Sequence, residues 1–367
     1  MITYPIKQIS LEEAINSQFK LVDVIQSVFR GHELLEDGDY GVSLELGRPK
    51  TTAKVEKVLA KFFDAEDSAL VRGAGTGAMR LVFNSLLKPL NTLLVHDAPV
   101  YPTTQNLMDM MGLKLLKVNM NNLNSFDILN DILKNTKVDA VLIQHSRQKP
   151  DDSYELEKAI KAIKDITDVP IITDENYVVM KVPYIGVQLG ADVSVFSMFK
   201  LLAPEGIGCV VGKKYIIDEI RKLTYSGGSQ VQGPEAMEAL RSLVYTPVSL
   251  AIQAMQVDEI VKRLNTEEIK GVKKAYVANA QSRVVLVEFE EPIVAKVLKY
   301  AEEMGAVPYP VGSESRYEIG AMFYRASGTF IENNPDIKNY VIRINPMRAG
   351  ADTVIRILKE AVKKSLT

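Results

Sequence analysis

Short apolar runs alternate with amphipathic stretches throughout residues 51–245, and this alternation restricts the possible folds more than any other feature. The runs that predict strands are Ala69–Val71, Thr92–Val95, Leu113–Val118, Val138–Ile143, Pro170–Thr173, Ala191–Phe196 and Ile207–Val211. Helices are predicted over Met79–Leu87, Thr103–Met111, Ser125–Lys134, Tyr154–Ile166 and from Lys214. Such alternation predicts an α/β fold whose mostly parallel, doubly wound sheet has helices on both faces. In this fold, ligands bind beside the carboxyl ends of the strands.

The sequence on either side of this region has a different pattern. We expect residues 1–50 to form an N-terminal arm with a helix over Leu11–Leu35, and residues 51–245 to form a large domain. Residues 246–367 are predicted to form a smaller C-terminal α/β domain. Its expected elements are a helix over Val248–Leu264, a strand over Arg283–Glu288, a helix over Pro292–Met304, a strand over Tyr340–Ile344 and a last helix from Ala351.

Composition and charge argue against several classes of protein. The chain of 367 residues has a net charge of −2 and no basic block, which argues against nucleic acid as a partner. No apolar run approaches the ~20 residues that a membrane span requires, and the N-terminus lacks the pattern of a signal peptide. Cys209 is the only cysteine, so no intrachain disulfide can form and a cytoplasmic location is expected. The histidines show no metal-ligand spacing, so no metal site is predicted.

Lys200 lies in the middle of the apolar segment Val193–Gly208 and is followed by a Pro-Glu-Gly turn. Burying an ammonium group is costly unless the group is paired or neutralised. An amine held in an apolar pocket has a lowered pKa and can attack a carbonyl to form a Schiff base. The alternative is a surface lysine with apolar neighbours, so the other motifs must decide between these two interpretations.

A glycine-rich turn, Arg-Gly-Ala-Gly-Thr-Gly-Ala at residues 72–78, precedes the helix expected over Met79–Leu87. It offers backbone N–H groups and the positive end of a helix dipole, which together suit a phosphate group. Thr76 adds a hydroxyl donor beside Gly75. The G-x-G-x-G spacing departs from the G-x-G-x-x-G of dinucleotide-binding proteins, and a dinucleotide site would leave Lys200 without a role.

Other polar residues follow the predicted strands and are expected to meet at one crevice. Tyr101 follows the strand over Thr92–Val95, Gln144 and His145 follow the strand over Val138–Ile143, and Asp174 follows the strand over Pro170–Thr173. The ends of parallel strands lie together, so residues distant in the sequence can share a ligand. Asp174 alone could instead be a helix N-cap, and Tyr101 an ordinary half-buried tyrosine.

Pyridoxal phosphate chemistry uses a set of groups of this kind. It needs a lysine for the aldehyde and a carboxylate that keeps the ring nitrogen protonated. It also needs a cup for the phosphate and an aromatic face for the ring. The candidates for these four tasks are, in the same order, Lys200, Asp174, Gly75 with Thr76, and Tyr101.

Three segments resemble parts of known pyridoxal phosphate enzymes. Lys200–Gly208 is similar to the lysine region of class V aminotransferases and of the selenocysteine-synthase-like group, with Ala203 in place of an expected glycine. Asp174–Tyr177 resembles the Asp-x-x-Tyr of class I aminotransferases, and Ser197 resembles a phosphate-binding serine three residues before the lysine. From about residue 45 to its end, the chain resembles a fold-type I pyridoxal phosphate enzyme of the aspartate aminotransferase superfamily.

The resemblance implies further roles. Tyr177 would hydrogen-bond the ring hydroxyl oxygen, and Gln144 or His145 would lie near the same oxygen. Arg343 resembles the arginine that binds the substrate carboxylate, for which a bidentate guanidinium is suited. Gly227 and Gly228 resemble a segment that reaches the phosphate of a partner subunit, so a homodimer with a shared site is implied.

The function expected from these residues is that of an aminotransferase acting on a small amino acid through a Lys200 Schiff base. A carbon–sulfur lyase that catalyses β- or γ-elimination, or a selenium-transferase-like enzyme, is the alternative within the same chemistry. A binding module with this fold would not need the lysine. A cysteine desulfurase is disfavoured because Cys209 falls in a predicted buried strand, where the thiol is inert.

Overall fold

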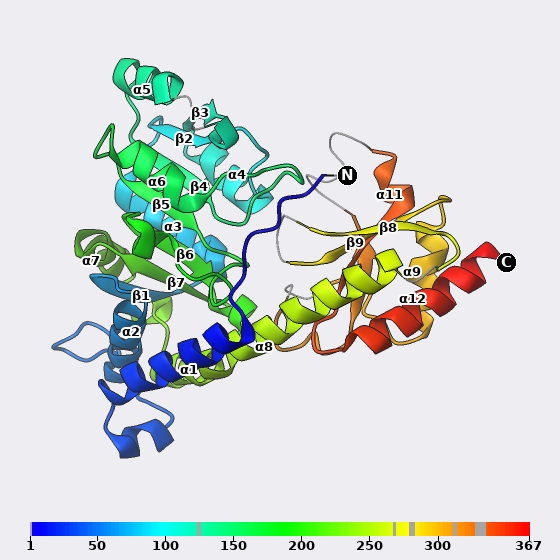
Figure 1. The fold of residues 1–367 in the computed structure, drawn as a ribbon. Helices are drawn as coiled ribbons and strands as arrows, with labels where there is room; N and C mark the ends of the chain where they lie inside the picture. The colour runs from blue at the N-terminus through cyan, green and yellow to red at the C-terminus, as the bar shows by residue number, and fades with distance from the viewer. Residues whose placement is uncertain (1, 123–125, 267–268, 279–282, 311–313, 327–334) are drawn as a thin grey trace. The chain divides into compact units, whose positions relative to one another are not determined.

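The computed structural model describes residues 2–122, 126–266, 269–278, 283–310, 314–326 and 335–367. The chain divides into two compact units (Figure 1). The larger unit consists of Glu12–Ser146 and Ser153–Pro247, and the smaller unit of Met1–Leu11, Arg147–Asp152 and Val248–Thr367. Among the helices of the described residues, none combines the length and the apolarity that crossing a membrane requires.

The larger unit is built on a seven-stranded sheet with the strand order β1-β7-β6-β5-β4-β2-β3. The strands are β1 (Asp67–Arg72), β2 (Thr92–His96), β3 (Lys114–Val118), β4 (Ala140–Gln144), β5 (Ile171–Asp174), β6 (Val193–Ser197) and β7 (Ile207–Gly212). Pairs from β3 to β6 are parallel, whereas β7 is antiparallel to both of its neighbours. Only residues 198–206 join β6 to β7, which is too short for the crossover that parallel strands need. The expected mostly parallel sheet is confirmed.

Helices cover both faces of this sheet. They are α2 (Lys50–Phe62), α3 (Ala74–Leu86), α4 (Pro102–Met110), α5 (Phe126–Asn135), α6 (Leu156–Lys164) and α7 (Lys214–Leu223). Neighbouring residues of β2 show the alternation: Leu93 packs in a cluster with Phe83 of α3, and Leu94 packs in another with Ile160 of α6. Successive side chains of a strand point to opposite faces, so each strand contributes to two apolar layers.

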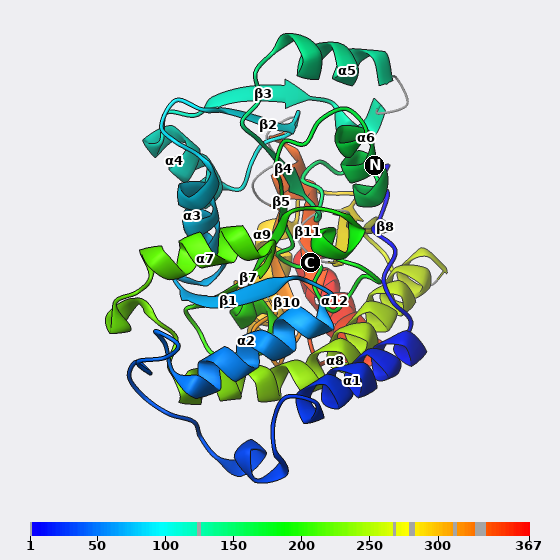
Figure 2. The ribbon, with the colours of Figure 1, turned by 90° about the vertical axis from the view of Figure 1, so that its left-hand side faces the viewer.

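The N-terminal region contains a shorter helix than expected. Helix α1 covers Leu11–Gln26, and a separate 3₁₀ turn, η1, covers Gly31–Leu35. The predicted helix over Leu11–Leu35 is therefore wrong beyond Gln26. The chain turns there because Phe29 is buried, with the Lys54 amine of α2 5.6 Å from its ring centroid. Figure 2 shows α1 beside α2, and the Lys20 amine donates a hydrogen bond to the carbonyl of Phe62.

Helix α8 begins much earlier than the sequence suggests. It covers Gly233–Thr266 and contains Pro247, whereas the prediction starts the helix at Val248. A proline lacks the N–H that an interior helical residue donates, and this makes it a plausible helix boundary in a sequence. The helix continues because Leu243 and Leu250 on either side are both buried. The Thr246 hydroxyl lies 2.8 Å from the carbonyl oxygen of Leu201, in the turn that contains Lys200.

The smaller unit has a four-stranded antiparallel sheet with the order β10-β11-β9-β8. The strands are β8 (Val272–Val277), β9 (Val285–Phe289), β10 (Met322–Arg325) and β11 (Val341–Asn345). After residue 290, the described part of the chain contains the helices α9 (Val294–Glu303), α11 (Ile337–Tyr340) and α12 (Ala351–Leu366). Ile342 and Ile344 of β11 pack in one cluster with α9 and α12. Strands β9 and β11 are predicted from the sequence, whereas β8 and β10 are not.

Candidate cofactor site

The predicted site residues of the larger unit lie along one edge of its sheet. Gln144, Asp174 and Ser197 end the adjacent strands β4, β5 and β6. Gln144 is paired in register with Asp174, and Ser197 with Gly208 at the start of β7. The N–H groups of Gly73 and Ala74, which follow β1, both donate to the carbonyl of Gly206, at 2.8 and 3.0 Å. The start of α3 therefore lies at the same edge.

Lys200 lies in a short 3₁₀ turn, η4 (Met198–Leu201), directly after β6. Met198 and Leu201 are fully buried, whereas Lys200 itself is half-buried. Its Nζ lies 3.7 Å from the centroid of the Tyr177 ring and 5.8 Å from that of the Tyr101 ring. An ammonium group over aromatic faces is attracted by the ring quadrupole. The structure thus brings Lys200 together with the two tyrosines predicted for the site.

Asp174 is buried, with 7% of its surface exposed, and Asn176 binds one of its oxygens. Its Oδ1 accepts hydrogen bonds from the backbone N–H of Asn176 at 3.0 Å and from the side-chain amide of Asn176 at 2.7 Å. Burial raises the pKa of the Asp174 carboxyl, while these hydrogen bonds and the charge of Lys200 oppose the rise. Oδ2 accepts no hydrogen bond from the residues that the structure describes, so it is available to a further donor.

The start of α3 has the geometry of an anion cradle. Gly73 and Ala74 have left-handed backbone angles, with φ of 90° and 53°. A Cβ atom at Gly77 would lie 2.0 Å from the carbonyl oxygen of Arg72, so only glycine fits there. The N–H groups of Gly75 and Thr76 belong to the first turn, where helix geometry provides no intrahelical acceptor. The Thr76 hydroxyl lies 3.1 Å from the Thr103 hydroxyl of α4.

The side chain of His145 contacts that of Glu175. The His145 Nδ1 lies 2.6 Å from Oε2 of Glu175, a fully buried carboxylate whose Oε1 accepts the N–H of Gly186 at 2.8 Å. The backbone N–H of His145 donates to the carbonyl of Asp174 at 3.0 Å. These contacts hold the imidazole ring against Glu175 and the backbone of His145 against that of Asp174. The role expected for Gln144 or His145, at the ring hydroxyl oxygen, stays a prediction.

The remaining predicted residues lie at more exposed positions or in the smaller unit. Tyr101 precedes α4 as its N-cap, and burial raises the pKa of its hydroxyl. Arg343 belongs to β11 and is buried, with 2% exposed. It alternates with Ile342 and Ile344, so its side chain lies on the face opposite α9 and α12. Gly227 and Gly228 are exposed in the 3₁₀ turn η5 (Gly227–Ser229) of the larger unit.

Three contributors to this region are not among the predicted site residues: Thr103, Glu175 and Asn176. Each acts on a predicted residue, namely Thr76, His145 and Asp174. One signal for two of them is present in the sequence. Asp174 ends β5, whose residues are all buried, and Glu175 and Asn176 follow it directly. Three successive polar residues at such a point need polar partners.

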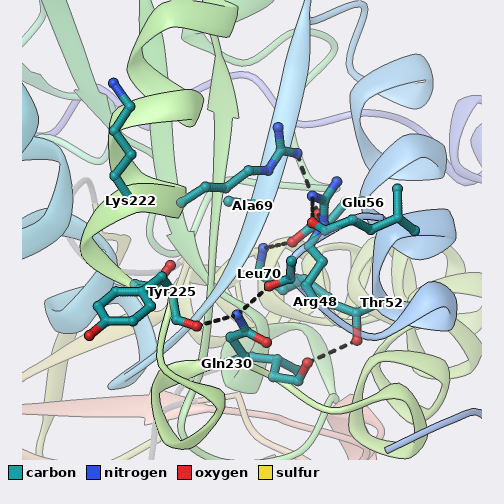
Figure 3. Close-up of a pocket in the computed structure, with 13 residues that line it drawn as sticks. Arg48, Thr52, Glu56, Ala69, Leu70, Lys222, Tyr225 and Gln230 are labelled. Carbon is teal, nitrogen blue, oxygen red and sulfur yellow. Dashed lines mark hydrogen bonds and ion pairs between the residues drawn. The ribbon is translucent and has the colours of Figure 1, made fainter. Parts of the chain in front are cut away.

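The structure also contains a cavity of about 280 Å³ elsewhere in the larger unit (Figure 3). None of the predicted site residues lines it; its lining includes Arg48, Glu56, Arg221, Tyr225 and Gln230. Glu56 is buried, and its Oε2 lies 2.7 Å from Nε of Arg48 and 3.4 Å from Nη2 of Arg221. Its Oε1 accepts the N–H of Leu70 at 3.0 Å. Both oxygens of this carboxylate are therefore occupied by the protein.

Comparisons with known proteins agree with the resemblance seen in the sequence. A YhfS protein of Escherichia coli (strain K12) is 49% identical over 362 residues, 99% of each chain. The crystal structure of the pyridoxal-5'-phosphate-dependent protein YhfS from Escherichia coli covers 99% of this chain and 100% of that chain, with a TM-score of 0.96 and 49% identity. A protein of Ureaplasma parvum serovar 3 named as a probable cysteine desulfurase is 28% identical over 181 residues, 46% of this chain and 44% of that protein.

Cystathionine γ-synthase from Xanthomonas oryzae pv. oryzae shares the fold at 17% identity, with a TM-score of 0.69 and 87% of each chain covered. The C-terminal domain of YhfS-like proteins matches residues 258–358. The family of class V aminotransferases matches residues 47–288, which is more than half of the chain. The chain therefore belongs to the class V aminotransferase family, one of the fold-type I families of pyridoxal phosphate enzymes.

Proposed function

We propose that this protein is a pyridoxal-phosphate-dependent transferase, and specifically an aminotransferase that acts on a small amino acid. One observation carries the proposal. The amine of Lys200 lies 3.7 Å over the ring of Tyr177, and its charge acts on the buried carboxylate of Asp174. A lysine for an aldehyde and a carboxylate for a ring nitrogen are the two groups that pyridoxal phosphate requires of its protein.

The residues of the larger unit fit this cofactor. Asp174 has an oxygen that no described residue occupies, and a ring N–H could bind it. The first-turn N–H groups of α3 at Gly75 and Thr76 suit the phosphate. We assign the hydroxyl of Ser197 to the same phosphate. Pyridoxal phosphate bound there would supply an electron sink for charge that develops at the α-carbon of an amino acid.

Lys200 has two tasks in this proposal. It holds the aldehyde carbon of the cofactor, and as a free amine it moves a proton at the α-carbon of the substrate. Its turn is fixed for both tasks, because the Thr246 hydroxyl binds the carbonyl of Leu201 and Leu202 has a left-handed φ of 64°. The ring of Tyr101, 5.8 Å from the same amine, is proposed to lie against the face of the cofactor.

Arg343 is proposed to bind the substrate carboxylate. Its guanidinium is buried in the middle of the apolar strand β11, and a carboxylate can accept two parallel hydrogen bonds from such a group. Arg343→Lys keeps the positive charge but removes the planar guanidinium that donates two parallel hydrogen bonds. We expect the substrate KM to rise at least about tenfold, the loss of one charged hydrogen bond, with cofactor affinity unchanged. Equal losses of substrate and cofactor affinity would indicate a structural role instead.

A homodimer is proposed as the working form of the enzyme. Support comes from the segment around Gly227 and Gly228, because the exposed side chain of Val42 lies 3.6 Å from the position of a Cβ atom on Gly227. Further exposed apolar side chains lie within two residues of Val42 or of Gly227 in the sequence. Tyr40, Leu44 and Tyr225 expose 78%, 102% and 79% of their surface. Clustered exposed apolar residues are typical of an interface. Light scattering should give twice the mass of one chain; a monomer at micromolar concentration that is fully active would contradict this proposal.

Sulfur transfer by a cysteine persulfide is not supported by this chain. Cys209 is its only cysteine and is completely buried in β7. Burial raises the pKa of its thiol well above the ordinary value, and the thiolate is the reactive form. A single buried cysteine also agrees with a cytoplasmic location.

A spectroscopic experiment tests the proposed function. The purified protein, mixed with pyridoxal phosphate, should show a visible absorbance band that borohydride converts to a stable bound chromophore. Lys200→Ala should abolish the bound chromophore, whereas Lys214→Ala, which removes an exposed lysine of α7, should keep it. A chromophore retained after reduction by the Lys200→Ala variant would contradict the assignment. Mass analysis of products from each common amino acid then separates a keto acid from an eliminated thiol or an inverted stereocentre.

A further inference from the structure

Asn176 connects three segments that are far apart in the sequence. Its side-chain Nδ2 donates to Oδ1 of Asp174 at 2.7 Å, and its Oδ1 accepts the backbone N–H of Ser197 at 3.1 Å. An N–H donor on one side and a carboxylate acceptor on the other allow only one orientation of the amide. Asn176 therefore joins the end of β5 to the end of β6, just before the turn that contains Lys200.

The third segment is the start of α3. A Cβ atom at Gly75 would lie 2.9 Å from both Nδ2 and Oδ1 of Asn176, closer than real Cβ contacts. Gly75 has ordinary backbone angles, so the need for glycine comes from this contact and not from its conformation. The amide of Asn176 is packed between the acidic end of β5 and the first turn that we assign to the phosphate.

The surroundings of Asp174 explain what this amide does. Burial disfavours the charged carboxylate, and the neighbouring Glu175 adds a like charge, although Glu175 is itself paired with His145. Lys200 is the cation that acts on Asp174, and the hydroxyls of Tyr101 and Tyr177 are the other titratable groups nearby. The two N–H groups of Asn176 are the hydrogen bonds that favour the ionised form.

We propose that Asn176 is a positioning residue of the cofactor site: its amide holds the Asp174 carboxylate ionised and aimed at the ring nitrogen, in fixed register with the Ser197 end of β6. The proposal rests on the proposed function. Oδ1 of Asp174 is the oxygen that Asn176 holds, which leaves Oδ2 for the ring. Asn176 itself touches no reacting atom in this role.

Two substitutions at Asn176 separate positioning from packing. Asn176→Ala removes both contacts of the amide, whereas Asn176→Asp keeps the shape and the acceptor for Ser197 but replaces the donor by a charge. We expect the dissociation constant for pyridoxal phosphate to rise about tenfold in Asn176→Ala, which corresponds to about 1.4 kcal/mol, and further in Asn176→Asp. Asn135→Ala, which removes an exposed asparagine bonded to Asp131, is the matched control and should change nothing.

A spectroscopic readout distinguishes this role from a structural one. With a less anionic Asp174, the ring holds less positive charge and the Lys200 nitrogen keeps its proton to higher pH. The pH midpoint of the visible band should therefore move upward in Asn176→Ala, while the melting temperature of the cofactor-free protein stays close to that of the unmodified chain. Asn176→Asp should show the larger movement of the midpoint, because its carboxylate repels that of Asp174.

Gly75→Ala provides an independent test of the same contact. The added methyl group would displace the Asn176 amide, so Gly75→Ala should weaken cofactor binding in the unmodified chain and add less than about a twofold effect in the Asn176→Ala background. Unchanged affinity and an unchanged pH midpoint in both Asn176 variants would overturn the proposal. If the unmodified chain binds no pyridoxal phosphate, the proposed function fails as well; if it binds the cofactor and only the Asn176 effects are absent, the proposed function stands.

Discussion

Two buried carboxylates of the larger unit, Glu56 and Asp174, differ in how completely the protein satisfies them. Both are almost inaccessible, with 3% and 7% of their surface exposed, and burial raises the pKa of each. Glu56 has two guanidinium groups within 3.4 Å and a backbone N–H on its other oxygen. Asp174 has both of its hydrogen bonds on one oxygen, and both come from Asn176.

In our proposal, Glu56 supports the fold and Asp174 binds a ligand, and the difference between their contacts agrees with these two roles. A buried charge is tolerated when opposite charges and hydrogen bonds surround it, as at Glu56. Asp174 is also buried, but it has fewer compensating contacts inside the chain. Polar groups left incompletely satisfied in this way are typical of functional sites, where a ligand completes the contacts. The cavity beside Glu56 therefore marks an ion-pair network (Figure 3).

The largest expected effect is on turnover when Asp174 loses its charge. Asp174→Asn keeps the shape and the acceptor for Asn176, but a neutral amide cannot stabilise a protonated ring nitrogen. We expect kcat with the best amino acid substrate to fall at least about 100-fold, with pyridoxal phosphate still bound. Steady-state kinetics and the visible spectrum measure the two properties. Asp131→Asn on the exposed side of α5 is the control, and equal rates for Asp174→Asn and the unmodified chain would contradict the role.

The next effect concerns stability and should be specific to the other carboxylate. Glu56→Gln keeps an oxygen for the N–H of Leu70 but leaves the charges of Arg48 and Arg221 without their shared partner. We expect the free energy of unfolding to fall by about 3 kcal/mol in urea titrations. Cofactor affinity of the folded protein should not change. Glu66→Gln, which breaks the exposed pair with Lys213, should cost less than about 1 kcal/mol.

Comparable losses of stability in the Glu56→Gln and Glu66→Gln variants would contradict the structural role of Glu56, because the buried pair would then stabilise the fold no more than a surface pair. A loss of cofactor binding in Glu56→Gln would also contradict this role, because Glu56 would then contribute to the cofactor site.

The smallest effect is a pH-dependent gain of stability in the cofactor-free Asp174→Asn variant. Because burial raises the pKa of Asp174 above its ordinary value of 3.8, the unfolded chain ionises at lower pH than the folded chain. The unmodified protein therefore loses stability as the pH rises through the folded pKa, whereas Asp174→Asn does not. At pH 7 the melting temperature of the variant should be a few degrees higher, and this gain should shrink as the pH approaches 4. A variant that is less stable than the unmodified chain at pH 7 would contradict this.

The sequence was sufficient for the parts of the fold that depend on local pattern. Alternating strands and helices predict the large sheet, and the ends of its strands bring Asp174, Ser197 and Lys200 to one edge. Strand β8 was missed because its pattern, with Lys273 and Lys274 exposed in the middle, does not alternate like that of a buried strand. The first half of α8 was not predicted because Pro247 indicates a helix boundary in the sequence. In the structure, the burial of Leu243 and Leu250 outweighs the energetic cost of a proline inside the helix.

The supporting contacts of the site depend on tertiary structure and could not be predicted. Asn176 contacts Gly75, about a hundred residues away, and no periodicity links two such positions. Glu56 occurs in the amphipathic helix α2, and its burial beside Arg48 and Arg221 follows from how α2 and α7 pack on β1. Polar pairs of this kind carry no sequence signal of their own.

Mapping the attachment site of the cofactor tests the central claim most directly. The holoenzyme is reduced with borohydride and digested, and the peptide that carries the pyridoxyl phosphate group is sequenced by mass spectrometry. We predict a single modified residue, Lys200, next to Phe199 and Leu201. Modification of any other lysine, or no modified peptide from a protein saturated with pyridoxal phosphate, would contradict the account.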